Sequence, residues 1–167
     1  MKTHQAILSL ILTGTLLLPF ATLTAKSVEI AWENPDSYRN VTHTYMGSDR
    51  ERDSILRELK AAFEQKALTR IPENSTLEIS FTQVELAGQF EPWRGHRYHD
   101  IRVVRDIYPA RLHFTWRLLD EDSGEIRSGE ERLTSMGVTQ RVPTTLDRDS
   151  YPYVKEIYNR WVERTFR

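Results

Sequence analysis

The chain has 167 residues, of which 28% are charged and 39% hydrophobic, and it contains no cysteine. Its 23 Lys and Arg side chains nearly balance 24 Asp and Glu side chains, so the net charge is −1. The length fits one domain, and the composition excludes collagenous, disulfide-stapled and multi-span membrane proteins. The charge balance gives no electrostatic basis for binding nucleic acid. Without thiols, cysteine nucleophiles, Cys-ligated zinc and iron–sulfur clusters are excluded.

The N-terminal segment, 1–25, has the composition of a secretory signal peptide. Lys2 is its only charged side chain, and a mostly apolar run follows over Ala6–Leu18. A basic start, an apolar core of roughly 7–15 residues and small residues before the cut are the three parts of such a signal. We expect cleavage after Ala25. We expect residues 26–167 to form a single periplasmic domain. Its net charge is −2, because cleavage removes Lys2.

An uncleaved membrane anchor is the alternative interpretation of this segment, because its uncharged stretch approaches the roughly 20 residues that span a bilayer. Threonine, glycine and proline dilute the stretch, and no basic cluster beyond Lys2 holds its start in the cytoplasm. No cysteine follows the apolar run, which excludes a bacterial lipid anchor. We therefore expect no stable membrane anchor after cleavage.

The first half of the expected domain is predicted to form a strand, a helix and a second strand. Apolar and polar residues alternate over 28–32, which is typical of a half-buried strand. A capping box that starts at Ser48 precedes apolar residues at helical spacing, which predicts a helix over 49–69. Alternation returns over 77–86, but its parity changes at Thr82–Gln83. This change predicts a β-bulge in the second strand.

The second half begins with an irregular segment, 89–106, with a short strand expected at 101–104. The clearest alternation in the chain follows over 112–118 and predicts a strand. Acidic residues and glycine over 120–124 predict a hairpin turn, because these residues suit tight turns. The returning segment, 125–133, is more polar and is expected to be an edge strand.

A last helix is predicted from apolar residues at helical spacing over 154–166, with Ser150 or Asp149 as its N-cap. The order β-α-β-(β)-β-β-α predicts an α+β fold, with a single mixed or antiparallel sheet of four to five strands. Each strand has one apolar face, so both helices should pack on one side of the sheet. The opposite side should carry mixed charges from Glu29, Glu78, Ser80, Arg111, His113, Thr115 and Arg117.

Several segments together resemble a known family. They are Val28–Trp32, Val84–Gly88, Phe90–Gly95, Asp100–Arg111, the hairpin from Leu118 to Gly124, and Trp161–Phe166. The chain is similar to the uncharacterised exported bacterial proteins grouped as domain of unknown function 3016, over almost all of residues 27–167. The resemblance implies a periplasmic location, and it supplies no activity, cofactor or catalytic residue.

A basic and aromatic group in the irregular segment is the main candidate binding surface. It consists of Trp93, Arg94, Arg97 and Tyr98. Arginine offers a planar fork of donors and tryptophan a stacking surface, so the group suits a sugar, an anion or a protein partner. In the alternative interpretation, Trp93 folds back onto the core and Arg94 pairs with Glu91.

The same segment contains a candidate metal site at His96, His99 and Asp100. Imidazole and carboxylate groups suit zinc, copper or nickel. A structural zinc site normally has four ligands, and the alternative is a polar loop with solvated histidines. We expect no cofactor.

We expect a non-catalytic periplasmic module that binds an envelope protein or a small ligand through residues 90–108, because loops of this kind carry function. A periplasmic hydrolase is the second hypothesis, and it would use Glu91, His96, His99 or Asp100. For Glu91 and Asp100, ion pairing with neighbouring arginines is the plainer interpretation. A third hypothesis is a structural subunit that docks through an apolar stripe on the last helix, at Tyr158, Trp161 and Phe166.

Overall fold

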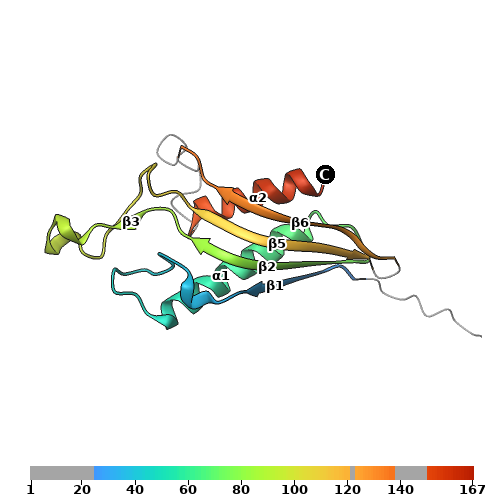
Figure 1. The fold of residues 1–167 in the computed structure, drawn as a ribbon, viewed down its shortest axis with the longest axis horizontal. Helices are drawn as coiled ribbons and strands as arrows, with labels where there is room; N and C mark the ends of the chain where they lie inside the picture. Colours follow the sequence, from blue (N-terminus) through green and yellow to red (C-terminus); the bar gives the residue numbers. More distant parts are fainter. Residues whose placement is uncertain (1–24, 121–122, 138–149) are drawn as a thin grey trace, which may run out of the picture.

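The computed structural model describes residues 25–120, 123–137 and 150–167. Its main sheet has the strand order β1-β2-β5-β6 (Figure 1). The strands are β1 (Ser27–Trp32), β2 (Ser75–Glu85), β5 (Arg111–Asp120) and β6 (Gly124–Thr134). β2 runs parallel to β1 and antiparallel to β5, and β5 runs antiparallel to β6. The sheet is therefore mixed, and the predicted α+β class is confirmed.

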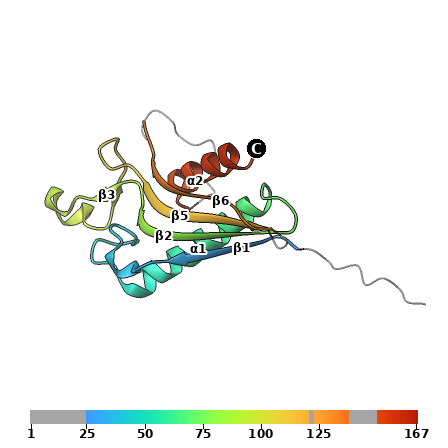
Figure 2. The same ribbon diagram turned by 45° about the vertical axis from the view of Figure 1, so that its right-hand side comes forward.

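Two helices, α1 (Asp49–Leu68) and α2 (Pro152–Thr165), lie side by side on one face of the main sheet (Figures 1 and 2). The residues that they turn toward the sheet are buried together with the inner side chains of β2 and β5. None of the helices in the described residues is long and apolar enough to cross a bilayer. The fold is thus a two-layer arrangement with one core between helices and sheet.

A small second sheet belongs to a segment that projects from one end of the main sheet (Figure 2). It pairs β3 (Gln89–Phe90) with β4 (Arg102–Val103), and two 3-10 turns, η2 (Pro92–Arg94) and η3 (His96–Tyr98), lie between these strands. We call residues 89–108 the arm. The short strand predicted at 101–104 corresponds to β4.

The start of α1 follows the predicted capping box in part. The Ser48 hydroxyl accepts a hydrogen bond from the Glu51 backbone N–H at 3.2 Å, as an N-cap does. The Glu51 carboxylate does not return to Ser48. It accepts hydrogen bonds from the His43 backbone N–H and the Thr44 hydroxyl, both at 3.4 Å. Glu51 therefore ties the preceding loop to the helix.

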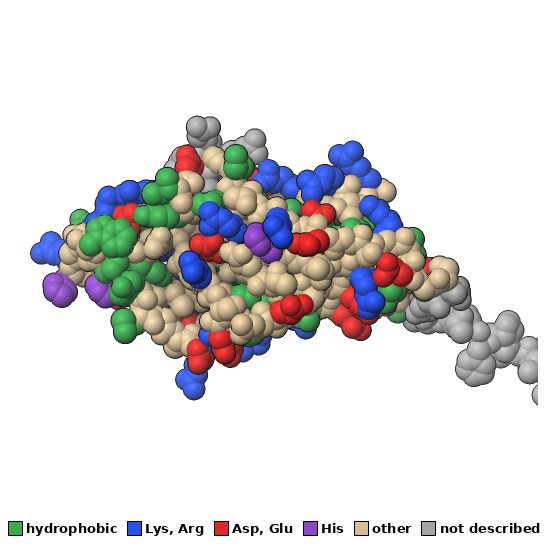
Figure 3. Space-filling model, in the orientation of Figure 1, with side chains coloured by type: hydrophobic (Ala, Val, Ile, Leu, Met, Phe, Trp, Pro, Cys, Tyr) green, Lys and Arg blue, Asp and Glu red, His purple; other side chains and the backbone are tan. Residues whose placement is uncertain are grey.

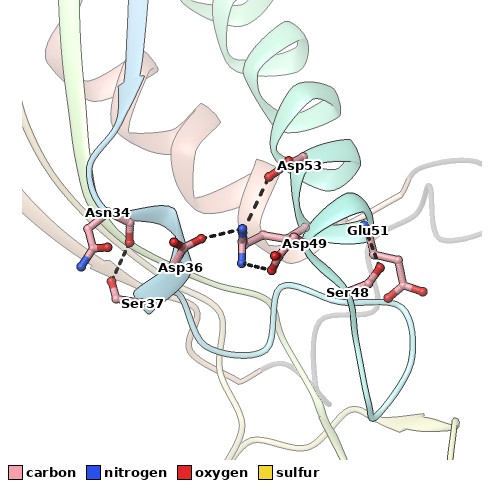
Figure 4. A network of polar contacts seen from close by, with 8 residues as sticks. Asn34, Asp36, Ser37, Ser48, Asp49, Glu51 and Asp53 are labelled. Carbon is pink, nitrogen blue, oxygen red and sulfur yellow. Dashed lines mark hydrogen bonds and ion pairs between the residues drawn. The ribbon is translucent and has the colours of Figure 1, made fainter.

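Arg52 fixes the connection between β1 and α1. Its guanidinium lies 2.6 Å from Asp36 in the 3-10 turn η1 (Pro35–Ser37), 2.9 Å from Asp49 and 3.7 Å from Asp53 (Figure 4). The Arg52 side chain is only 14% exposed, but Asp36, Asp49 and Asp53 are 79%, 86% and 55% exposed, so water screens these ion pairs as it does other surface pairs. The arginine gathers three carboxylates at the point where the chain leaves the sheet and enters the helix.

The predicted β-bulge in β2 is confirmed. Pairing with β5 shifts register between Phe81 and Gln83, so one extra residue lies on the β2 side. The shift turns Val84 onto the same buried face as Phe81. An aromatic cluster fills this face, in which the Phe63 and Tyr158 rings stack with centroids 4.0 Å apart and an interplanar angle of 16°. The bulge thus lets one long strand keep a continuous apolar face.

The hypothesis that α2 docks a partner through an exposed apolar stripe is wrong. Tyr158, Trp161 and Phe166 are all buried, because α2 turns this stripe onto β5, where Trp161 packs edge-on against Phe114. The prediction of Ser150 as N-cap is also wrong, and Asp149 lies outside the described residues. The N-cap is Tyr151, and Pro152 is the first helical residue. Proline suits this position because its missing N–H would have no partner in the first turn.

The open face of the main sheet carries the mixed charges that the alternation predicts. Arg117 lies 2.5 Å from Glu78, its register partner across β2 and β5, and Arg111 lies 2.7 Å from Glu85. Opposite charges across neighbouring strands stabilise a solvated sheet face. β6 is the expected edge strand, and the Ser123 backbone N–H donates to the Asp120 carboxylate at 2.9 Å in the hairpin turn.

The arm as a candidate binding surface

The base of the arm is held by a buried carboxylate. Glu91 is 2% exposed and lies 2.6 Å from the Arg94 guanidinium. It also accepts hydrogen bonds from Arg105 at 3.3 Å and from the Tyr108 hydroxyl at 3.2 Å. These partners come from both the outgoing and the returning halves of the arm. Because a buried carboxylate needs such partners, Glu91 fastens the two halves together.

Arg102 forms a second attachment, between the arm and the loop that precedes α1. Its guanidinium donates to the backbone carbonyl oxygens of Gly88 and Asn40 at 3.1 Å and of Thr42 at 2.5 Å. It also lies over the Phe90 ring, 4.6 Å from the centroid. Burial lowers the Arg102 pKa to about 10, which still leaves the side chain charged at neutral pH. The arm is therefore fixed to the body of the domain.

The loop before α1 also touches the far part of the arm. The Tyr45 backbone N–H donates to the Asp100 carboxylate at 3.1 Å. The Tyr45 ring meets the His99 ring edge-on, with centroids 4.9 Å apart. Residues 45–46 and the two 3-10 turns consequently form one continuous surface.

Large apolar side chains gather at the end of the molecule that carries the arm, on the left in Figure 3. Met46 is 82% exposed, Trp93 68% and Tyr98 50%. Soluble domains rarely expose contiguous apolar side chains of this size without a binding role. We call the following residues the tip patch: Tyr45, Met46, Trp93, Tyr98, Ile101 and Ile107.

Three of the four residues predicted as a binding group are available to a partner. Trp93, Arg97 and Tyr98 are all exposed on the arm, and Arg97 makes no hydrogen bond or ion pair with any described residue. In the alternative interpretation, the pairing of Arg94 with Glu91 is right. The packing of Trp93 onto the core is wrong, because Trp93 lies in the short turn η2 and its side chain is 68% exposed.

Four residues of the tip patch were absent from the sequence-based group: Tyr45, Met46, Ile101 and Ile107. Ile101 and Ile107 lie in the irregular segment, where no alternation separates exposed from buried apolar residues. Tyr45 lies 55 residues before Asp100, and the hydrogen bond between them has no local sequence signal.

The residues of the candidate metal site lie in different surroundings. His96 is exposed on η3, His99 packs against Tyr45, and Asp100 is used by the Tyr45 N–H. Across the described ranges, no three His, Cys, Asp or Glu side chains are arranged to hold a metal ion. The geometry adds no further ligand to His96, His99 and Asp100, and metal binding there stays a prediction.

The residues named for a hydrolase show no catalytic arrangement. Acid–base catalysis needs groups within hydrogen-bond reach of each other or of a shared substrate position. Glu91 is engaged below the surface by two arginines and a tyrosine. No hydrogen bond joins any two of Glu91, His96, His99 and Asp100, all of which are described.

One broad hollow lies beside the arm and another lies against the main sheet. The first, of about 540 Å³, lies between the arm base and the loop before α1, and its lining includes Tyr45, Phe90 and Ile107. The second, of about 910 Å³, is lined by residues of all four main strands and by Lys60 and Glu64 of α1. Neither is lined by Trp93 or Tyr98. These two exposed rings are therefore available to insert into a partner, whereas Tyr45 and Ile107 of the tip patch also border the first hollow.

The fold and this surface define a small α+β domain whose attached arm exposes basic and aromatic side chains. A family model described as "Protein of unknown function (DUF3016)" matches residues 26–164, and the chain belongs to this family. No curated protein matches it. A similar solved structure is a minor lipoprotein from Acinetobacter baumannii, 12% identical, covering 86% of this chain and 89% of that chain with a TM-score of 0.26. A TM-score at this level supports no inference about fold or function.

Proposed function

We propose that the protein is a non-catalytic module of the bacterial periplasm that binds another component of the envelope through the tip patch. The observation that carries this proposal is the tip patch itself, because Trp93 and Tyr98 stand exposed on an arm fastened at Glu91 and Arg102. Tryptophan, tyrosine and arginine are the residue types that contribute most to binding surfaces.

The rigidity of the arm supports a binding role. Exposed aromatic side chains on a mobile loop lose conformational entropy when a partner orders them, whereas a fixed arm has already lost it. The attachments at Glu91 and Arg102 together make six polar contacts and one ring contact, all of which involve residues of the arm. Their effect is to hold the tip patch in one place.

Site-specific photo-crosslinking in living bacteria tests the proposal. A photoreactive amino acid replaces Tyr98 or Ile101, and a matched control replaces Ile126, an exposed apolar residue on β6. We expect discrete products from the two tip positions that the control position does not give, with the captured protein or lipid identified by mass. Equal labelling from all three positions would refute a binding role for the tip patch.

Export is proposed from the composition of residues 1–25, which precede the matched family domain. Fractionation of the envelope, followed by intact-mass measurement, tests it. We expect periplasmic material that begins at Lys26. Cytoplasmic material that retains Met1 would contradict both export and cleavage.

A further inference from the structure

We infer that the component bound by the tip patch is the anionic surface of a lipid bilayer, into which Trp93, Tyr98 and their apolar neighbours insert. This inference rests on the proposed function, because it names the partner of the same surface. It follows from the side chains that the tip patch combines, from the charge around them and from the shape of the arm.

The side chains of the tip patch are those that favour the boundary between lipid and water. Tryptophan and tyrosine concentrate at the level of the lipid headgroups, where an amphipathic ring keeps its polar atom hydrated. Met46 and Ile101 add purely apolar exposed side chains. A cluster of separate projecting side chains can enter a fluid bilayer without a preformed complementary pocket, and two 3-10 turns present them in this way.

Charge separates the arm from the rest of the domain. Residues 89–108 contain four arginines and three acidic residues, for a net charge of +1, whereas the remainder of 26–167 carries −3. Neither Glu91 nor Asp100 presents a free carboxylate, since Glu91 is buried between two arginines at the arm base and Asp100 accepts from the Tyr45 N–H. Arg97 is exposed and free of any described partner.

An anionic surface therefore attracts the arm and repels the body, which orients the molecule with its tip patch toward the membrane. A negatively charged protein surface offers the same attraction, but it also needs a cavity shaped for the projecting Trp93 ring. The bilayer requires no such match, and it is the occupant that both the residue types and the charge pattern favour.

Vesicle flotation tests the inference with periplasmic protein whose intact mass shows that residues 1–25 are absent. The protein is mixed with vesicles of phosphatidylglycerol and phosphatidylcholine in equal parts, or of phosphatidylcholine alone. We expect flotation with the anionic vesicles that weakens as salt is added, because salt screens the attraction. Trp93 emission should shift to the blue, since Trp116 and Trp161 are already buried and Trp93 is the most exposed of the four tryptophans.

Matched variants distinguish insertion of the tip patch from nonspecific adsorption of the protein to vesicles. Trp93→Ser should lower the affinity at least about tenfold, and Arg97→Gln about fivefold. Ile126→Ser and Arg167→Gln remove the same kinds of group away from the arm, and they should change the affinity less than about twofold. Near-UV circular dichroism of each variant shows that its aromatic core is intact.

The outcomes divide cleanly. Absence of flotation with anionic vesicles, or equal losses in tip and control variants, overturns the lipid inference. If flotation is absent but crosslinking from Tyr98 in cells captures one protein, the proposed function stands with a protein partner. If both experiments are negative, the proposed function and the inference fall together.

Discussion

Two buried tyrosines pack against β2 but differ in the fate of their hydroxyl groups. The Tyr38 hydroxyl donates to the Phe81 backbone carbonyl at 2.6 Å. The Tyr158 hydroxyl is buried without a hydrogen-bond partner among the described residues, and burial raises the pKa of this group above its ordinary value. Replacement of each by phenylalanine removes one oxygen and leaves the ring in place. We expect the two substitutions to change stability in opposite directions.

The magnitudes follow from the surroundings of each oxygen. Tyr158→Phe removes a polar group that lost its water without gaining a partner, so it should stabilise the fold by about 1 kcal/mol. The stack with Phe63 at 4.0 Å is kept. Tyr38→Phe removes a hydrogen bond worth about 1 kcal/mol. The loss stays near this value because the Phe81 carbonyl also accepts from the Glu33 backbone N–H at 2.8 Å, and it is not left unpaired.

Urea unfolding followed by circular dichroism measures the free energy of unfolding of each variant, and thermal unfolding measures its melting temperature. We expect Tyr158→Phe to raise the melting temperature by about 3 °C and Tyr38→Phe to lower it by a similar amount. A loss of stability of more than about 0.5 kcal/mol in Tyr158→Phe would mean that its hydroxyl has a partner, such as an ordered water. That result would refute the reasoning, whatever the behaviour of Tyr38→Phe.

Three further predictions concern the arm, the edge strand and alkaline pH. Glu91→Gln should lower stability by about 1–2 kcal/mol and speed amide hydrogen exchange across the arm. The cost is limited because its half-exposed arginine partners lose their buried carboxylate but still reach water. An unchanged exchange rate in the arm would contradict the role of Glu91 in holding its two halves together. Gly129→Val should cost about 1–3 kcal/mol in urea unfolding, since even a Cβ there meets Trp116 Nε1 at 2.9 Å; an unchanged midpoint would show that β6 yields freely. Burial raises the pKa values of Tyr38 and Tyr151 to about 12, above the ordinary value of about 10. Their contribution to stability is therefore complete below about pH 10 and lost as the pH rises toward 12, which urea unfolding at successive pH values and absorbance of the ionised phenols can follow.

Local periodicity predicted the elements well because burial on one side leaves a repeating pattern. The parity change at Thr82–Gln83 located the bulge, and the spacing behind Ser48 located α1 within about one residue. Whether the sheet was mixed or antiparallel stayed open, because the direction of β1 beside β2 depends on how α1 crosses the sheet. Nothing within Ser27–Trp32 records that direction.

The site was less predictable because its contacts join distant parts of the chain. Arg102, for example, donates to backbone carbonyls 60 and 62 residues away. Backbone acceptors are the same for every residue type, so the sequence carries no sign of them. The exposure of Trp93 likewise depends on the orientation of a 3-10 turn, which residue type alone does not determine.

The parallel pairing of β1 has a consequence for how the chain reaches its fold. β1 is the first strand of the described residues, and β2, the strand that it pairs with there, ends at Glu85. During synthesis, this half-apolar strand lacks its hydrogen-bond partners while more than 40 further residues are added. Exposed strands of this kind pair readily with other chains. The strand at the edge of the finished sheet is thus also exposed to pairing with other chains while the protein is being made. Lys60 donates to the Ile30 carbonyl at 3.0 Å, and it can cover this edge only after α1 has formed.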